Sequence, residues 1–408
     1  MRHRIIKSLT VLYTKITTSI AFIPALVAIT FLILSFTVVQ FDFSESGKAI
    51  KSNAHWLTLK DASTARSIIS TITGGLISLT VFSFSMVMIL LNQAASQMSN
   101  RILEKLIGNR FQQLVLGFYI GTIVYALFLL STIRDINSGI YVPAISTYLL
   151  IAFTVIDIFL FIYFLHFVTQ SVKYETIIQQ ISDTTQKAME KSCLIKDEQL
   201  NNVDLKNGKI IRASKSGIFQ GFLQEPLISL CEKEDLKIHF HHFTGTMVLK
   251  GNPLLTLESK NGLSKNIEED LQSLINIHGG QDIKTNYYYG FRQLMEVAVK
   301  ALSPGINDPG TAILSLHALT NLLAIRLQNF PSVHLKDQNN VIRIITEERS
   351  FKDIFQDCIY PIWDYGKTDR LVLKELISML GQLQHISDNS LQSDLLLQSQ
   401  RLLSHMDQ

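Results

Sequence analysis

The chain has 408 residues, of which 47% are hydrophobic and only 17% are charged. Soluble domains carry about a quarter charged residues, so this deficit is typical of a membrane protein. The formal net charge of +3, without a basic block, gives no reason to expect nucleic acid as a partner. The cysteines Cys193, Cys231 and Cys358 lie far apart, without disulfide or metal-ligand spacing, and are expected to be buried reduced thiols.

Four apolar stretches are long enough to cross a hydrocarbon core of about 30 Å, which requires roughly 20 helical residues. They occupy residues 20–39, 68–91, 114–133 and 142–167. We therefore predict an α-helical integral membrane domain of four transmembrane helices within residues 1–169, with a basic segment at its N-terminus. The lipid bilayer is its expected surroundings.

Lysine and arginine are distributed unevenly between the loops of this domain. One side carries Arg2, Arg4, Lys7, Lys15, Arg101, Lys105, Arg110 and Lys173. The other side carries Lys48, Lys51 and Lys60, whose charges are balanced by acidic residues in the same loop. The positive-inside rule then places both termini in the cytoplasm.

A polar stripe runs along the second span. At 100° per residue, seven small or polar residues project within about 40° of one direction. A stripe of this kind lets helices approach closely in lipid, and its hydroxyls bond across the contact. Alternatively, several copies turn it toward a shared water-filled path, and the sequence leaves both interpretations open. The stripe consists of Ser67, Thr71, Gly74, Ser78, Ser85, Asn92 and Ser96.

Asp157 falls near the middle of the fourth span. A charge there costs at least a few kcal/mol unless it is neutral, paired or hydrated. We expect Asp157 to face the interior of the helical bundle and to bond hydroxyls of the second span. Either a structural hydrogen bond or a role in binding an ion or a proton accounts for it.

The rest of the chain is predicted to form a cytoplasmic α+β domain with a small β-sandwich-like part and a helical C-terminal part. Within it, residues 170–260 are predicted to form a helical linker and a small β-rich subdomain. Short runs with strand character between 209 and 258 alternate with Ser-Gly, Thr-Gly and Gly-Asn-Pro turns. Their pattern is similar to that of a small lipoyl-type sandwich. His239 and His241 are expected on one strand face, and His242 on the other. Since zinc needs four ligands and no cysteine pair is nearby, no metal site is predicted.

Residues 261–408 are predicted to form a helical subdomain. The expected helices span residues 263–277, 287–302, 311–328, 351–365, 369–386 and 391–406. Between the second and third of these, Asp308 is a typical N-cap followed by Pro309 at the first helical position. This corner is either a rigid turn or a site for a ligand or a neighbouring subunit, in which case its polar residues are Ser303, Asn307, Asp308 and Thr311.

Two segments resemble one known bacterial family. They are ARSIISTITGGLISLTVFSFSMVMILLNQAASQMSNRILEKLIGNRFQQLVLGFYIGTIVYALFLL and FRQLMEVAVKALSPGINDPGTAILSLHAL, and ALSPGINDPGTA at residues 301–312 is the most specific part. The family is one of predicted inner-membrane proteins catalogued as a domain of unknown function. The resemblance implies four spans, a cytoplasmic globular region and location in the bacterial inner membrane. It implies no activity.

These patterns favour an oligomeric membrane channel or transporter-like protein with a cytoplasmic assembly or regulatory domain. Four spans leave little room for a pathway within one chain, so a homo-oligomer is expected, with an inorganic ion as a candidate ligand. The alternative is a membrane-anchored regulatory or scaffold protein that binds a partner or small ligand through its cytoplasmic domain. No catalytic residues or cofactors are predicted, because no nucleotide-binding loop or nucleophile motif is found.

Overall fold

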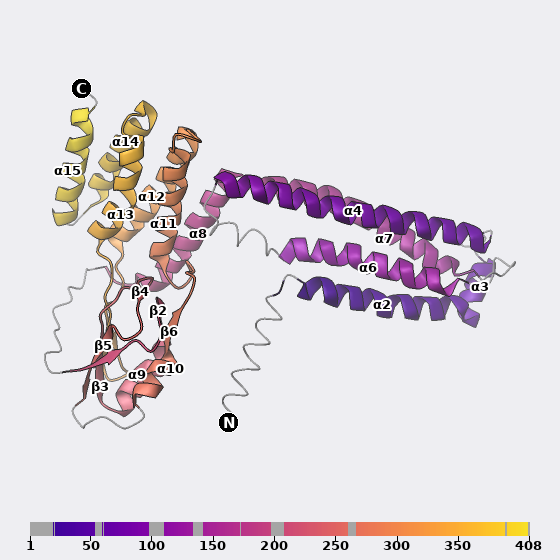
Figure 1. The fold of residues 1–408 in the computed structure, drawn as a ribbon, viewed down its shortest axis with the longest axis horizontal. Coiled ribbons are helices and arrows are strands. Elements are labelled where there is room, and N and C mark those ends of the chain that lie inside the picture. The colour runs from indigo at the N-terminus through magenta and orange to yellow at the C-terminus, as the bar shows by residue number, and fades with distance from the viewer. Residues whose placement is uncertain are drawn as a thin grey trace. The chain divides into compact units, whose positions relative to one another are not determined.

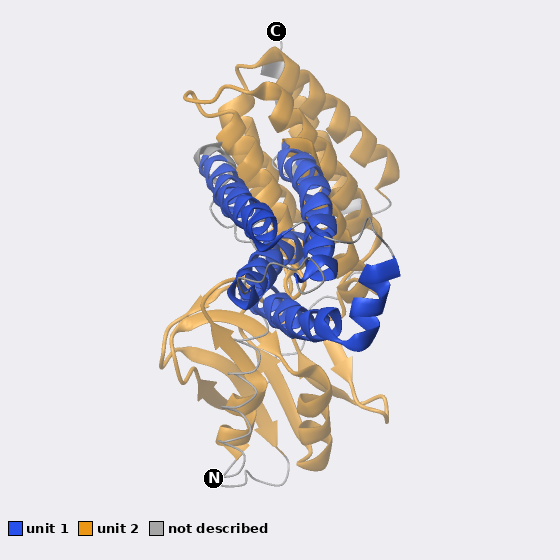
Figure 2. Ribbon diagram, turned by 90° about the vertical axis from the view of Figure 1, so that its right-hand side faces the viewer, with its two compact units in different colours: residues 1–173 blue, residues 174–408 orange. Residues whose placement is uncertain are grey.

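A computed structural model describes residues 19, 21–53, 59, 61–97, 110–133, 142–171, 173–196, 208–259, 267–387 and 390–406. The chain divides into two compact units, Met1–Lys173 and Tyr174–Gln408 (Figure 2). The predicted basic residues Arg2, Arg4, Lys7, Lys15, Lys60, Arg101 and Lys105 lie outside the described residues.

The first unit is a bundle of long apolar helices (Figure 1). By length and composition, five described helices of the chain are able to cross a membrane: α2, α4, α6 and α7 of this unit and α12 of the second. The prediction of several long apolar helices is therefore confirmed, whereas the predicted count of four spans is not fixed by these criteria. The elements of the first unit are α2 (Phe22–Phe43), α3 (Glu45–Asn53), α4 (Ala62–Gln97), α6 (Arg110–Thr132) and α7 (Ala144–Ser171).

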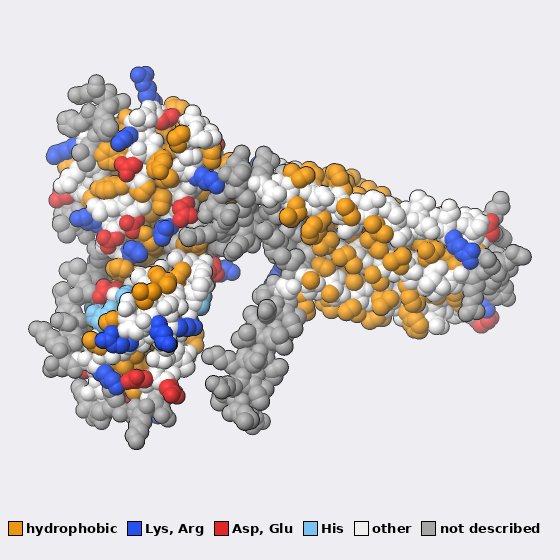
Figure 3. Space-filling model, in the orientation of Figure 1, with side chains coloured by type: hydrophobic (Ala, Val, Ile, Leu, Met, Phe, Trp, Pro, Cys, Tyr) orange, Lys and Arg blue, Asp and Glu red, His pale blue; other side chains and the backbone are white. Residues whose placement is uncertain are grey.

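The outer surface of this bundle is apolar. Hydrophobic side chains cover most of its visible face in Figure 3, and charged ones gather near the end that carries α3. Between α2 and α6, Gly117 and Gly121 bring the backbones together. A Cβ atom on Gly121 would meet the Phe31 ring at 2.8 Å. Small residues four apart allow this close helix contact in lipid, where water provides no driving force.

The end of the bundle near α3 holds a buried ion pair. Lys51 Nζ lies 2.8 Å from Asp42 Oδ1, and both side chains are fully buried. Asp42 Oδ2 accepts bonds from the backbone N–H and the hydroxyl of Ser146 in α7, at 2.8 and 3.0 Å. Lys51 also donates to the carbonyl of Val142, and Tyr125 of α6 donates to that of Ser146. These bonds join α2, α3, α6 and α7.

The second unit contains two small sheets and a group of helices. A five-stranded sheet has the order β1-β5-β3-β8-β7, and a three-stranded sheet has the order β4-β2-β6. Both contribute to one hydrophobic core, where Phe219 stacks on Phe240. The strands are β1 (Lys209–Arg212), β2 (Gly217–Phe222), β3 (Leu236–Phe240), β4 (Met247–Val248), β5 (Pro253–Ser259), β6 (Ile275–His278), β7 (His334–Lys336) and β8 (Ile342–Ile345).

The helices of this unit agree with the predicted ranges, with one exception. The predicted helix 263–277 is wrong beyond Leu274, because Ile275 and Ile277 turn inward as alternate residues of β6. The sheets also recruit β7 and β8 from a segment that was not predicted to form strands. The helices are α8 (Tyr174–Ser192), α9 (Gln224–Lys233), α10 (Ile267–Leu274), α11 (Tyr287–Ala301), α12 (Pro309–Gln328), α13 (Phe351–Gly366), α14 (Arg370–Ile386) and α15 (Ser390–Met406).

Gly290 sets the distance between α11 and α8. A Cβ atom at this position would lie 1.8 Å from Thr185 Oγ1 and 2.8 Å from Thr185 Cβ. We expect Gly290→Ala to lower the free energy of unfolding by about 1–3 kcal/mol, as overpacking does. Gly381 of α14 is the matched control, since its nearest contact would be 3.5 Å away.

Gly381→Ala is expected to raise the free energy of unfolding by about 0.5–1 kcal/mol, because alanine is the better helix former. Denaturant unfolding of both full-length variants in detergent measures the difference. Equal stability of the two variants would contradict the close contact at Gly290.

Candidate functional site

The polar stripe lies on the outside of α4. Every stripe residue with a described side chain is exposed in the single chain. The opposite face of α4 is buried and carries Ala65, Ile69 and Leu76. A Cβ atom added to Gly74 would meet nothing within 4 Å. No other part of the described chain therefore covers the stripe. Its exposed members are Ser67, Thr71, Gly74, Ser78, Ser85 and Asn92; the side chain of Ser96 lies outside the described set.

The hydroxyls of α4 are satisfied within their own helix. Ser78 and Ser85 donate to the carbonyls of Gly74 and Val81, each at 2.9 Å. This back-bonding gives a hydroxyl a partner where water is absent. Each of these oxygens keeps lone pairs that accept a further bond, so the stripe is able to meet a polar partner.

Asp157 is fully buried within the bundle, as predicted, but its neighbours differ from those expected. Thr122 and Tyr119 of α6 lie beside it. The expected bonds to hydroxyls of the second span are not formed: Ser83 of α4, for example, donates to the carbonyl of Leu79 at 2.8 Å. The reason is the same back-bonding, which occupies the α4 hydroxyl protons. Among the described residues, Asp157 Oδ1, Asp157 Oδ2 and Thr122 Oγ1 have no hydrogen-bond partner.

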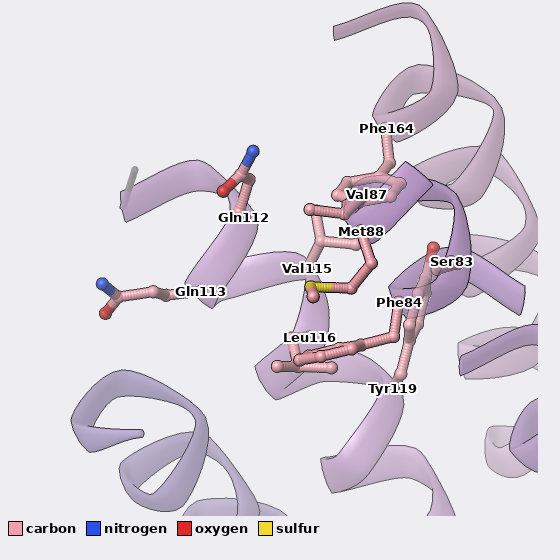
Figure 4. A pocket seen from close by; sticks show the side chains of 10 residues that line it. All are labelled: Ser83, Phe84, Val87, Met88, Gln112, Gln113, Val115, Leu116, Tyr119 and Phe164. Atoms are coloured by element: carbon pink, nitrogen blue, oxygen red, sulfur yellow. The ribbon is translucent and has the colours of Figure 1, made fainter. Parts of the chain in front are cut away.

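A small pocket lies next to this cluster. It has a volume of about 120 Å³ between α4, α6 and α7, and its wall is mostly apolar. Figure 4 shows Ser83 and Tyr119 together at one side of it. The other lining residues are Phe84, Val87, Met88, Gln112, Gln113, Val115, Leu116 and Phe164.

The corner between α11 and α12 is a capped turn. Asp308 accepts a bond from the backbone N–H of Thr311 at 3.1 Å and one from its hydroxyl at 2.5 Å, which confirms the predicted N-cap. Ser303 donates to the carbonyl of Lys300, and Asn307 adopts a left-handed backbone with φ of 50°. The carboxylate and hydroxyls of the corner are thus used locally, and a ligand role for Ser303, Asn307, Asp308 and Thr311 stays a prediction.

The histidines at the end of β3 bond to protein groups. The rings of His239 and His241 lie 5.3 Å apart, in contact with Glu347 and Thr256 respectively, each at 2.9 Å. His242 bonds instead to the carbonyl of Pro253. Within the described ranges, no group of three His, Cys, Asp or Glu side chains is placed to hold a metal ion.

All three cysteines are free and buried, as predicted. Burial raises the pKa of Cys193 to about 11 and that of Cys231 to about 12. Because the thiolate is the reactive form, these thiols are inert at neutral pH.

A charged cluster in the second unit was not predicted. Arg326 is almost completely buried, stacks on the Phe330 ring and donates to the carbonyl of Arg349. Burial raises the pKa of the nearby Glu348 to about 7, and the charges of Arg326 and Arg349 oppose this shift. No sequence motif marks the cluster, because its members come from α12 and from the segment after β8.

The chain is similar to proteins of one family. The family described as "Predicted membrane protein (DUF2254)" matches residues 17–382. Uncharacterized protein Rv1290c of Mycobacterium tuberculosis and uncharacterized protein Mb1321c of Mycobacterium bovis are each 24% identical over 331 residues. The alignment covers 78% of this chain and 63% of the relatives' length. No solved structure matches the chain.

Proposed function

The chain belongs to the DUF2254 family of predicted membrane proteins, and we propose that it acts as a homo-oligomeric membrane channel or transporter. In this proposal the copies meet along the exposed stripe of α4, which lines a path for a small inorganic ion. The observation that carries the proposal is the exposure of the stripe: Ser67, Ser78 and Asn92 face outward from the single chain. Acyl chains offer no partner to the lone pairs that these hydroxyls keep or to the amide of Asn92, so contact with protein or water is the better environment.

Four helices are proposed to span the bacterial inner membrane, namely α2, α4, α6 and α7. The fifth apolar helix, α12, is assigned to a cytoplasmic domain for two reasons. Half of the residues in its most apolar stretch are buried, and it carries the buried charged residue Arg326. α12 also packs against α8, α11 and α14 of its own unit. Both termini are proposed to be cytoplasmic from the distribution of basic residues.

The stripe is tested by cysteine cross-linking between copies. Ser78 and Ile77 are adjacent and both exposed, but they project about 100° apart on the helix. In full-length protein in membranes, Ser78→Cys is expected to form disulfide-linked dimers on oxidation, because like residues meet at an oligomer axis. The matched variant Ile77→Cys is expected to stay monomeric on a denaturing gel. The native cysteines are buried and provide a low background.

Equal cross-linking of Ser78→Cys and Ile77→Cys would contradict the proposed contact. If Ser78→Cys cross-links, ion flux into liposomes is measured next for Ser78→Leu and Asn92→Leu. Loss of flux with intact oligomers supports a lined path, whereas unchanged flux would leave the stripe a packing surface.

A second candidate function rests on α12. A cavity of about 460 Å³ lies between α12 and α14, and one of about 250 Å³ lies between α12 and α8. His317 borders both and contacts Glu375 at 2.8 Å. These polar grooves suit a membrane-anchored regulatory protein that binds a small polar ligand. A monomeric mass in detergent would favour this function over the channel.

A further inference from the structure

Asp157 is a buried carboxyl group without a hydrogen-bond partner among the described residues. The side chain is fully buried, and neither carboxyl oxygen makes a hydrogen bond to any described residue. No described lysine, arginine or histidine forms an ion pair with it. An ionised carboxylate in such surroundings costs several kcal/mol, so something must neutralise the charge or occupy the oxygens.

The titratable groups around Asp157 are few. Tyr119 faces it from α6. The charged side chains of the other helices that pack on α7 lie toward the ends of those helices. Near α3, Asp42 binds Lys51, Glu45 pairs with Lys48, and Arg66 lies at the carbonyl of Ile133. Arg110 is the first residue of α6, about three helical turns before Thr122. None of these cations is available to balance Asp157.

The hydroxyl of Thr122 is suited to a protonated carboxyl. Thr122 Oγ1 lies beside Asp157, is fully buried and also has no partner at normal hydrogen-bond geometry. A neutral carboxylic acid has one O–H donor, and a threonine hydroxyl has two acceptor lone pairs. A single proton on Asp157 thus satisfies two otherwise unpaired groups.

The pocket between α4, α6 and α7 lies next to this position. Tyr119 belongs to both places, because it lines the pocket and lies beside Asp157 (Figure 4). Ser83 lies against Tyr119 at the same wall. Phe164 of the pocket stands seven residues after Asp157, on the same face of α7.

We propose that Asp157 is a reversible proton-binding site inside each copy of the chain. The protonated carboxyl donates to Thr122 and exchanges its proton along the hydroxyls of Tyr119 and Ser83 toward the pocket. The site is separate from the α4 stripe, so it stands whether or not the copies form a channel.

The chain supplies its own control in Asp42. Both carboxyls belong to the first unit and both are fully buried, but Asp42 is paired with Lys51 at 2.8 Å and accepts two bonds from Ser146. Asp42 therefore already has a cation and two donors at its oxygens, whereas the oxygens of Asp157 have no partner among the described residues. Any probe of the acid form should distinguish the two.

Dicyclohexylcarbodiimide is such a probe. A carboxylic acid adds its O–H across one C=N bond of this apolar reagent, and the adduct then rearranges to a stable N-acylurea without loss of any group. Full-length protein in liposomes is treated over a series of pH values in choline chloride, and the modified residue is identified by peptide mass spectrometry. We expect an adduct on Asp157 and none on Asp42. Above the midpoint, labelling should fall about tenfold per pH unit.

A second measurement detects the protonated carboxyl even if the reagent does not reach it. The infrared absorption of a protonated carboxyl is compared between the parent and Asp157→Asn. Both proteins carry Glu348→Gln, because the raised pKa of Glu348 would otherwise add a band of its own. A band lost in Asp157→Asn supports the proposal. Absence of both the adduct and the band would overturn it. Protection of Asp157 by sodium or potassium chloride would also overturn it, by assigning the site to an alkali-metal ion.

Discussion

Replacing Lys51 by methionine is expected to lower the free energy of unfolding of the first unit by about 3–5 kcal/mol, the cost of leaving a buried charge without its partner. Lys51 and Asp42 are both fully buried and 2.8 Å apart. Methionine fills a similar volume but removes the ammonium group. The remaining Asp42 keeps its bonds from Ser146, which do not cancel its charge.

Lys48 provides the matched control within the same short helix. It pairs with Glu45 at 3.3 Å, but the Glu45 side chain is 96% exposed. Lys48→Met should therefore change the free energy by less than about 1 kcal/mol, as surface pairs do. Titration of the full chain with sodium dodecyl sulfate in mixed micelles measures both variants. Similar losses in the two would mean that Lys51 is not buried as described.

The double variant Asp42→Asn, Lys51→Met separates charge from shape. Because it removes both charges and keeps most of the volume, it should recover much of the stability lost in Lys51→Met. A double variant as unstable as the single one would instead assign the loss to the bonds that Asp42 makes with Ser146.

The sequence predicted the helices well because their signals are local. Hydropathy and length give both ends of α2, α6 and α7 to within four residues, whereas α4 extends six residues beyond the predicted span at each end. Asp308 with Pro309 gives the start of α12. An apolar helix is predicted from its own residues alone. A strand is predicted only when its pairing partner is known, and β8 pairs with β3 across about a hundred residues of chain.

The polar contacts escaped prediction for a related reason. Lys51 was expected in a loop, as one of several lysines balanced by acids, and its burial depends on the approach of Ser146 and Val142 from another helix. The interior position of Asp157 was predicted from its place in an apolar span. Its neighbours were not, since helical periodicity fixes the face of one helix and leaves the rotation of the next undetermined.

A second large effect is expected from Glu348. Burial raises the pKa of this carboxyl from 4.5 to about 7 in the folded protein. The folded state therefore binds the proton more tightly than the unfolded state, so the contribution of Glu348 to stability is fully present below pH 4.5 and is lost as the pH rises to 7. The interval of about 2.5 pH units sets an upper limit of about 3 kcal/mol on the loss. Above pH 7 this contribution is constant.

The fluorescence of Trp363 reports on the unfolding of the second unit, because Trp363 lies in α13 of that unit. The chain has one other tryptophan, Trp56. Denaturant unfolding of full-length Trp56→Phe, followed by Trp363 fluorescence between pH 4.5 and 8, gives the slope. Glu348→Gln should be the more stable protein at pH 7 and should lose this part of the slope, because glutamine does not ionise. Glu225→Gln, at an exposed position of α9, should keep it. An unchanged slope in Glu348→Gln would show that its carboxyl is ionised in the folded protein, and that Arg326 and Arg349 outweigh the effect of burial.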